Sequence, residues 1–556
     1  MQRREFMESA LAAGVVSNTG ASTVTAAETN SEDVKTETKP RIMFFHDSRH
    51  PSIYMYEPPM KKEEFEAAVD ELVGTPVEAL MFGLGDGRTV FHDTQVGEVW
   101  GDPVDQWNHL VFRRAGQNAR MMLDSGQDPL LIICERARQK GIRIYPTLLV
   151  NQARRAETRE DDVRSSAFRW DNIHLEIGAR GDVNDFAGAT NLDFKHERVR
   201  DERFDLIDEV LTNYPIDGFE LQLNYRSNSV AFFHPQEIDA GRDIMTAWVK
   251  RVYEAVKASG SERDLVIRVP NDMELAYSLG LDVREWVRQG IVDTLAAETY
   301  VYRMDPTADF RPLVDVCKDS ECRVLAALKT RISSDRLDNG TIEFIRAAAC
   351  NYWAQGIDGL YLDQWFTAWP YDSIFYEQLR EVVDPDVMSY KDKIYFVPTD
   401  TRPDMGTPLP VELNVNRTVE VTLPISDDLP RWNDVGRIHE VMLRLRLSGA
   451  TETDRVEFRL NGKLLPDSHL RKISRVYRMQ APRYRVFGYW FIYRLDPDQW
   501  PVRGHNLIEV TLRHRDGDII PSLDLRDVEF EFRYLSGNNF ARGQDPDVGP
   551  YVVRTL

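Results

Sequence analysis

Short apolar runs alternate with helix-periodic segments over residues 41–387 of this chain. Eight of these runs have the length and composition of buried strands, at 42–47, 79–85, 142–151, 218–224, 265–270, 294–300, 323–329 and 359–365. The segments between them, such as 62–73 and 241–259, repeat apolar residues at the spacing of an amphipathic helix. Alternating strands and helices predict a parallel sheet, and eight repeats predict its closure into a (β/α)8 TIM barrel.

The segments that join these elements differ in length at the two ends of the predicted strands. Helix-to-strand connections are short, as at 213–217 and 289–293, whereas those after the second and third strands run for tens of residues. Long loops at one end predict a functional mouth at the carboxyl ends of the strands. An open doubly wound sheet is the competing fold, but residues 83–87 lack the spacing of its glycine-rich dinucleotide turn.

The pattern changes after residue 387, where helical periodicity gives way to alternating strands, among them 441–449 and 506–515. Asn461 and Gly462 form a strong signal for a tight hairpin turn. Many strands joined by short turns predict an all-β jelly-roll or sandwich domain. We therefore expect an α/β fold, with a barrel over 41–387 and a β-sandwich over 388–556.

The N-terminal region has the features of an export signal. Residues 1–27 place adjacent Arg3 and Arg4 before a modest apolar run and then small residues, as in a twin-arginine signal; the alternative is an ordinary disordered tail. Residues 28–40 are polar and charged, which predicts a disordered linker. No other stretch approaches the ~18 consecutive apolar residues of a membrane span. We expect an exported protein, periplasmic or extracellular, without a transmembrane segment.

Charge, cysteines and histidines narrow the class of function. The net charge of -21 leaves no basic stripe for a phosphate backbone, so nucleic acid is not an expected partner. The four cysteines do not form a disulfide framework, although Cys317 and Cys322 are close enough to bridge across a short loop after export, and this question stays open. The 11 histidines are scattered, so we expect no catalytic metal and no cofactor.

Polar side chains gather where the predicted barrel strands end. Such groups are costly inside a sheet unless they find partners or perform chemistry. The fourth run, IDGFELQLN at 216–224, shows this most clearly, because its apolar positions alternate with polar ones. The candidates for the mouth of the barrel are His46, Asp47, Asn151, Glu220, Asn224, Arg268, Asn271, Glu298, Tyr300, Lys329, Asp363 and Trp365.

Three of these candidates are carboxylic acids with a potential catalytic role. Two carboxyl groups facing each other over a mouth are the minimum for hydrolysis of a glycosidic bond. We expect Glu220 and Glu298 to share the acid role and the nucleophile or base role, with Asp363 as a third catalytic candidate, and the remaining candidates to hold the sugar. The alternative for Glu220 is a structural carboxylate paired with Arg268 or Lys329.

Three further segments carry a resemblance to a known family: YPIDGFELQ at 214–222, AFFHP at 231–235 and GIDGLYLDQW at 356–365. In these segments the barrel resembles the glycoside hydrolase family 10-like barrels of bacterial exported proteins, which implies a (β/α)8 fold acting on a polysaccharide. This chain departs from true family 10 xylanases, which carry their second glutamate on strand seven, where Lys329 stands here. Its strand-four and strand-six pair is closer to α-galactosidase-type barrels.

The C-terminal domain carries a resemblance of its own. VEFRLNGKLL at 456–465 and GHNLIEVTL at 504–512 look like galactose-binding-type jelly-roll modules.

Two alternatives to a glycosidase remain open for the function of the barrel. One is a carbohydrate-binding barrel without catalysis, which predicts that its carboxylates are locked in ion pairs. The other is a polysaccharide lyase, with Tyr300, Lys329 or Arg268 beside a uronate.

Overall fold

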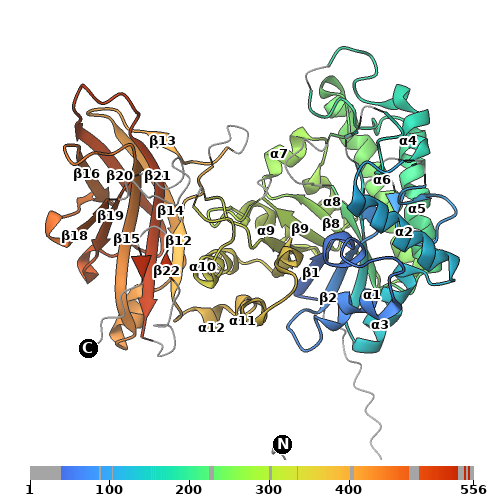
Figure 1. Cartoon of the computed structure of the whole chain (residues 1–556), viewed down its shortest axis with the longest axis horizontal. Helices are drawn as coiled ribbons and strands as arrows, with labels where there is room; N and C mark the ends of the chain where they lie inside the picture. Colours follow the sequence, from blue (N-terminus) through green and yellow to red (C-terminus); the bar gives the residue numbers. More distant parts are fainter. Residues whose placement is uncertain are drawn as a thin grey trace, which may run out of the picture. The chain divides into compact units, whose positions relative to one another are not determined.

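In the computed structural model, eight parallel strands close into a barrel in the order β1-β11-β10-β9-β8-β7-β6-β2 (Figure 1). The strands are β1 (Ile42–His46), β2 (Ala79–Gly83), β6 (Arg143–Leu149), β7 (Gly218–Gln222), β8 (Asp264–Pro270), β9 (Thr294–Glu298), β10 (Arg323–Leu328) and β11 (Gly359–Leu362). Each strand pairs in parallel with the strands that precede and follow it around the barrel. The predicted barrel is confirmed, and the open sheet is wrong.

The structure describes residues 39–86, 89–102, 104, 106–151, 153–154, 156, 158–164, 166–183, 186–223, 231–299, 303–334, 336–400, 406–474, 488–535, 544–545 and 549–550. The predicted signal at 1–27 and nearly all of the predicted linker at 28–40 lie outside these residues. Residues 40–556 form a single compact unit.

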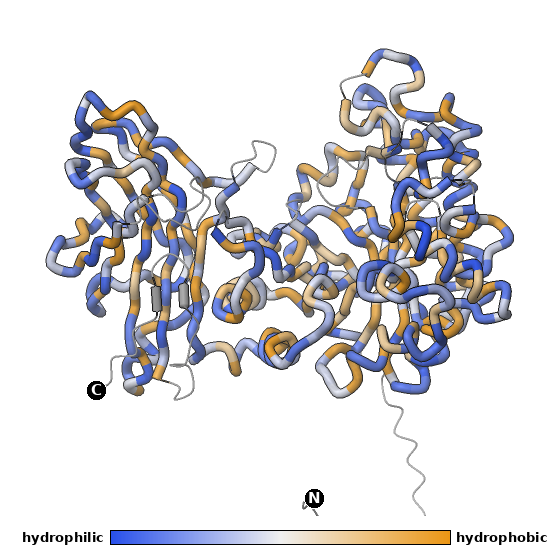
Figure 2. The backbone as a smooth tube through the Cα atoms, in the orientation of Figure 1, coloured by the Kyte–Doolittle hydropathy of each residue, from blue (hydrophilic) through white to orange (hydrophobic). Residues whose placement is uncertain are grey.

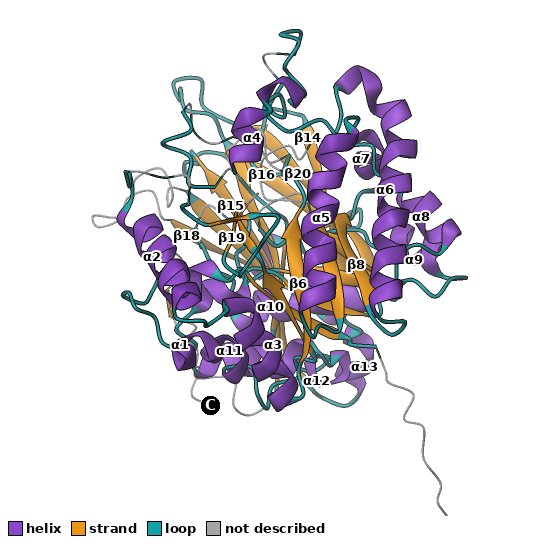
Figure 3. Cartoon of the chain, turned by 90° about the vertical axis from the view of Figure 1, so that its right-hand side faces the viewer, coloured by secondary structure: helices purple, strands orange, loops and turns teal. Residues whose placement is uncertain are grey.

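Helices surround the barrel, and Figure 3 shows α5 and α6 in front of its strands. They are α1 (Lys62–Asp70), α2 (Leu110–Asp124), α3 (Pro129–Lys140), α4 (Ala167–Asp171), α5 (Glu197–Asn213), α6 (Ile238–Ser259), α7 (Met273–Ser278), α8 (Val283–Gln289), α9 (Arg311–Cys317), α10 (Ile342–Trp353), α11 (Ser373–Val382) and α12 (Pro385–Met388). α3 illustrates their end signals, because Asp128 caps its first turn and Gly141 ends it in the left-handed conformation.

The long loop after β2 carries a small sheet of β3 (Gly85–Asp86), β4 (Thr89–Val90) and β5 (Glu98–Val99). The loop after β6 carries α4 before the chain reaches α5. Both long loops leave the carboxyl ends of their strands, as the sequence predicts, so the barrel has the elaborated end that a functional mouth requires.

Side chains along each barrel strand alternate between two cores. Met43 and Phe45 of β1 point inward and pack with residues such as Tyr145 and Tyr361. Phe44 lies between them in sequence and belongs instead to the outer core beneath the helices. This alternation decides which polar residues near the strand ends reach the inside of the barrel.

The C-terminal residues form two antiparallel sheets. The first has the order β12 (Lys393–Phe396), β21 (Asp524–Tyr534), β15 (Ile438–Ser448), β19 (Tyr489–Arg494) and β18 (Leu470–Ser474), with β13 (Val411–Glu412) also on β21. The second has the order β14 (Thr418–Ile425), β20 (Gly504–His514), β16 (Arg455–Leu460) and β17 (Lys463–Leu464). The remaining elements are α13 (Leu429–Asp434) and the pair β22 (Gln544–Asp545) and β23 (Gly549–Pro550).

These sheets agree with the predicted sandwich, and Figure 2 shows hydrophilic and hydrophobic residues alternating along their strands. The predicted hairpin joins β16 and β17, where Asn461 and Gly462 both adopt positive φ angles of 50° and 78°. Such angles are those of a tight hairpin turn, which explains the Asn-Gly signal.

The strand β12 connects the sandwich to the barrel. Its Tyr395 packs in the sandwich core, whereas Ile394 and Phe396 belong to the outer core of the barrel. Phe396 meets Phe344 of α10 edge to face, with 5.2 Å between the ring centroids. The predicted boundary after residue 387 falls at the end of α12, one short turn before this shared strand.

All four cysteines, Cys134, Cys317, Cys322 and Cys350, are free thiols and are buried. Within the ranges given above, no helix combines the length and the apolar character needed to cross a membrane.

Candidate active site

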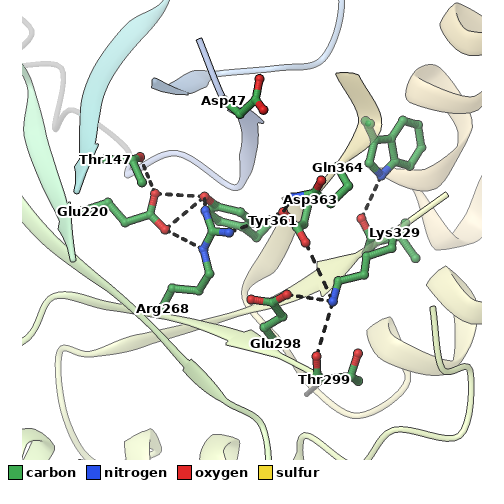
Figure 4. A network of polar contacts seen from close by, with 12 residues as sticks. Asp47, Thr147, Glu220, Arg268, Glu298, Thr299, Lys329, Tyr361, Asp363 and Gln364 are labelled. Carbon is green, nitrogen blue, oxygen red and sulfur yellow. Dashed lines mark hydrogen bonds and ion pairs between the residues drawn. The ribbon is translucent and has the colours of Figure 1, made fainter. Parts of the chain in front are cut away.

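Five ionisable side chains from five successive strands meet inside the barrel (Figure 4). They are Glu220 of β7, Arg268 of β8, Glu298 of β9, Lys329 directly after β10 and Asp363 directly after β11. None of them is more than 3% exposed. Each occupies an inward position, Glu220 in the middle of β7 and the other four toward the carboxyl ends of their strands. The alternation along the strands and the closure of the barrel therefore bring all five together.

Glu220 is saturated with hydrogen bonds. Thr147 Oγ1 donates to its Oε2 at 2.6 Å, and Arg268 Nε donates to its Oε1 at 2.8 Å. The hydroxyl of Tyr361 lies 3.0 and 2.9 Å from the two carboxylate oxygens. Glu220 is the third of five residues in β7, so it lies deeper in the barrel than side chains at the strand ends. This arrangement matches the structural-carboxylate alternative for Glu220, in which it pairs with Arg268.

Arg268 connects Glu220 to the carboxylate on the last strand. Its Nη1 lies 3.4 Å from Asp363 Oδ1, and its Nη2 donates to the Tyr361 hydroxyl. Its guanidinium carbon lies 4.3 Å from the ring centroid of Phe45 and 4.5 Å from that of Tyr361, so aromatic rings hold the group in place. Burial lowers the pKa of Arg268, but the charges of Glu220, Tyr361 and Asp363 outweigh it and leave the pKa raised.

Lys329 joins the other two carboxyl groups. Its Nζ lies 2.7 Å from Glu298 Oε1 and 3.8 Å from Asp363 Oδ2. It also donates to the backbone carbonyl of Thr299 at 3.3 Å. Asp363 accepts a further hydrogen bond of 3.2 Å from Gln364. Asp363 therefore lies between two cationic side chains, and its two oxygens face different ones.

The surroundings of Glu298 shift the pKa of its carboxyl group. Burial is the largest influence and raises the pKa of Glu298. The charges of Lys329 and Arg268 lower it, and the charge of Asp363 raises it. The net effect is a raised pKa, and a general acid requires a shift in this direction.

Asp47 organises the turn after β1. Its Oδ1 accepts from the backbone amides of Arg49 and His50 at 3.1 and 3.0 Å, and its Oδ2 contacts the Arg49 guanidinium at 3.3 Å and the His50 ring. Burial raises the pKa of Asp47, but Arg49 and His50 more than reverse this and leave the pKa well below its usual range. His50 keeps about half of its side chain exposed and stacks on Phe366 at 5.8 Å.

Two expected sugar ligands, His46 and Trp365, face away from the inside of the barrel, and their predicted role stays a prediction. His46 follows the inward Phe45, so it points outward and stacks on Phe82 at 5.2 Å. Burial lowers the pKa of His46 to about 4, and its Nδ1 accepts from the Ser48 amide. Trp365 is fully buried and donates to the Leu328 carbonyl, so it has no free face for a sugar.

Two further expected sugar ligands, Asn151 and Asn271, donate hydrogen bonds to backbone carbonyls of loops. Asn151 is buried, and its amide donates to the carbonyls of Leu192 and Ala231 at 2.9 and 2.8 Å, tying two loops together. The amide of Asn271 donates to the Asp309 carbonyl at 3.2 Å. Asn224 and Tyr300 lie outside the described residues, so their predicted roles stay predictions.

Tyr361 and Thr147 contribute to the network but are not among the residues expected from the sequence. Tyr361 lies two positions before Asp363, and Thr147 is the register partner of Glu220 on the neighbouring strand. The two-residue period of a strand places Tyr361 on the same face as Asp363, which was the available signal. Thr147 gives no comparable signal, because its partner is fixed by strand register.

No protein-family model matches the chain, and neither does any curated protein. Solved structures do match. They include an endo-1,4-beta-mannanase from Rhizomucor miehei (12% identity, 63% of this chain and 95% of that chain, TM-score 0.41) and an alpha-amylase from Geobacillus thermoleovorans (12%, 86% and 98%, TM-score 0.36). A cycloisomaltooligosaccharide glucanotransferase from Paenibacillus sp. also matches (9%, 88% and 57%, TM-score 0.33), and this chain spans little more than half of its length. At these values the likeness carries no argument about function, which rests on the site.

Proposed function

We propose that this protein is a glycoside hydrolase acting on a poly- or oligosaccharide, with Glu298 and Asp363 as the reacting pair. The observation that carries the proposal is their shared contact with Lys329, at 2.7 and 3.8 Å. The facing carboxyl oxygens can be no farther apart than these two distances combined. Retaining glycosidases hold their carboxyl groups about 5–5.5 Å apart and inverting ones about 6.5–9.5 Å. The limit for these two oxygens lies at the bottom of the inverting range, and we propose a retaining reaction.

The surroundings of the two groups suggest their roles. Glu298 has the raised pKa of a proton donor and would protonate the leaving oxygen. Asp363 accepts from Arg268 and Gln364, which orient its carboxylate to attack the anomeric carbon. Glu220, whose oxygens are all engaged, acts in this proposal as a positioning residue for Arg268.

The proposal includes action after export, since Arg3 and Arg4 precede an apolar run as in a twin-arginine signal. The paired arginines and the apolar run in the sequence are the features that support export.

A carbohydrate-binding barrel without catalysis is the second candidate. The observation that favours it is that Glu220, Glu298 and Asp363 are all in ion pairs and at most 3% exposed. A polysaccharide lyase has less support, because its candidate base Lys329 contacts two carboxyl groups and Tyr300 lies outside the described residues.

The test is hydrolysis of a panel of polysaccharides by the purified mature chain. We expect Glu298→Gln and Asp363→Asn each to lower kcat by about 100-fold or more while the chain stays folded. The matched control is Glu262→Gln, an exposed carboxyl group just before β8 at the other end of the barrel, which should act as the unsubstituted chain does. Near-normal turnover in both site variants would sink the assignment, and absence of hydrolysis with retained sugar binding would favour the second candidate.

A further inference from the structure

A separate cavity of about 280 Å³ lies between α10, α12 and α13, and we refer to it as the α10–α13 cavity. Trp353, the last residue of α10, lines it. α10 runs from the loop after β10 back toward the start of β11, so its last residue lies at the amino ends of the barrel strands. Lys329 and Asp363 lie at the carboxyl ends, so the cavity is not part of the candidate active site.

Two indole rings border this cavity, and both are held in place by neighbours. Trp353 donates from Nε1 to the Val382 carbonyl at 2.8 Å. Trp432 of α13 meets Tyr390 edge to face at 5.6 Å, and the Arg431 guanidinium carbon lies 5.0 Å from its ring centroid. Both rings are partly buried. Aromatic groups fixed in this way lose little conformational freedom when a ligand packs on them.

Charged groups of both signs surround the two rings. Arg431, Arg503, Asp386, Asp427 and Asp428 all line the cavity, and Asp427 is already paired with Lys393 at 3.1 Å. Neither guanidinium forms an ion pair with any residue that the structure describes. Asp428 Oδ1 accepts from the Arg431 backbone amide at 3.2 Å, which leaves its other oxygen available for a ligand. Because Lys393 neutralises Asp427, the two arginines balance Asp386 and Asp428 in charge, so the lining favours a neutral ligand rich in both donors and acceptors.

We infer that the α10–α13 cavity is a secondary carbohydrate site that binds a neutral sugar unit of a polysaccharide. The apolar face of a pyranose ring would pack on an indole, while its hydroxyls donate to the carboxylates and accept from the arginines. The cavity volume is near the lower end of the ~300–1,000 Å³ range of small-molecule pockets, which suits about one or two sugar rings. The choice of ligand class rests on the proposed function.

The inference is tested by calorimetric titration of the full mature chain with cellohexaose, xylohexaose, mannohexaose and maltohexaose. The Glu298→Gln variant serves as background to prevent turnover, in parallel with the unsubstituted chain. We expect at least one hexasaccharide to bind, and Trp432→Ala and Arg503→Ala each to weaken it about tenfold or more. Arg503 is exposed, so its substitution leaves the packing of α13 unchanged. The control Arg417→Ala, an exposed arginine elsewhere on the sandwich, should bind as the background does.

Binding of none of the four hexasaccharides would overturn the inference. Binding that both cavity variants retain would also overturn it, because the sugar would then occupy another site. The proposed function fails separately, if the unsubstituted chain hydrolyses no polysaccharide. Binding that depends on Trp432 and Arg503 in a chain without hydrolytic activity would keep the cavity assignment and reject the catalytic one.

Discussion

Arg268 Nε donates a 2.8 Å hydrogen bond to Glu220 inside the barrel, and neither side chain is more than 1% exposed. Desolvation of two charges is expensive, so such a pair persists only when further hydrogen bonds satisfy both groups. Thr147 and Tyr361 supply those bonds to Glu220. The pair therefore forms a rigid base beneath Glu298 and Asp363, which lie nearer the strand ends.

The first prediction concerns the stability of this base. Glu220→Gln keeps the size of the side chain but removes the charge that pairs with Arg268. We expect a loss of about 3–5 kcal/mol in the free energy of unfolding, because Arg268 would stay buried without its main counter-charge. Urea denaturation measures this change in the free energy of unfolding, with Glu262→Gln as the control variant. A Glu220→Gln chain that keeps its full stability would contradict the role of this pair as a rigid base.

A second prediction follows from the raised pKa of Glu298. As proton donor, Glu298 must be protonated, so activity exists below its pKa and is lost as pH rises through it. Lys329 lowers the pKa of Glu298, so Lys329→Met should raise that pKa and move the alkaline limb of the kcat/KM profile to higher pH. An alkaline limb that stays in place or moves to lower pH would contradict the role of Glu298.

The close approach of Glu298 and Asp363 to Lys329 predicts the stereochemistry of the product. A retaining reaction yields a first-formed sugar with the anomeric configuration of the substrate. Proton NMR during the first minutes of hydrolysis distinguishes the two anomers before they interconvert. Inversion would mean that Asp363 activates water instead of attacking the anomeric carbon.

A fourth prediction concerns Arg336, which lies in the loop between Lys329 and α10. Its side chain is 1% exposed and pairs with Asp527 at 3.3 Å and with Glu529, both on β21 of the sandwich. Arg336→Ala would leave two buried carboxylates with fewer counter-charges, at a cost of about 3–5 kcal/mol. Thermal unfolding should show the loss, whereas the exposed Arg417→Ala should leave the transition unchanged. Equal midpoints would indicate that the Arg336 contacts add no stability.

Export gives a fifth prediction. Replacement of Arg3 and Arg4 by lysines should retain the full-length chain inside the producing cell, because a twin-arginine receptor reads the paired arginines. Cell fractionation and immunoblotting measure the distribution. An unchanged distribution would identify residues 1–27 as an ordinary N-terminal tail.

The barrel could be predicted because its signals are local. Each strand and helix carries its own periodicity, and eight repeats leave few ways to close the sheet. The same signals place Glu220, Glu298, Lys329 and Asp363 at one end of the barrel. Their partners are set by strand register and by reach across the interior, as when Tyr361 of β11 contacts Glu220 of β7. Neither the strand register nor the reach of a side chain across the interior can be predicted from the local sequence.

His46 and Trp365 face away from the inside of the barrel for definite physical reasons. His46 is adjacent to the inward Phe45, so strict alternation turns it outward. Trp365 follows Gln364, whose φ angle of 63° breaks the extended backbone, so the alternation of β11 no longer predicts where the indole points. Counting positions from the inward residues predicts the first orientation, but the second depends on a turn that only the structure reveals.

The strand β12 has a consequence for the modularity of the chain. Ile394 and Phe396 pack in the outer core of the barrel, whereas Tyr395 packs in the core of the sandwich, so adjacent residues of one strand belong to two hydrophobic cores. Truncation of the chain on either side of β12 would remove core contacts from either the barrel or the sandwich. Because β12 contributes packing to both halves, the barrel and the sandwich are expected to unfold together.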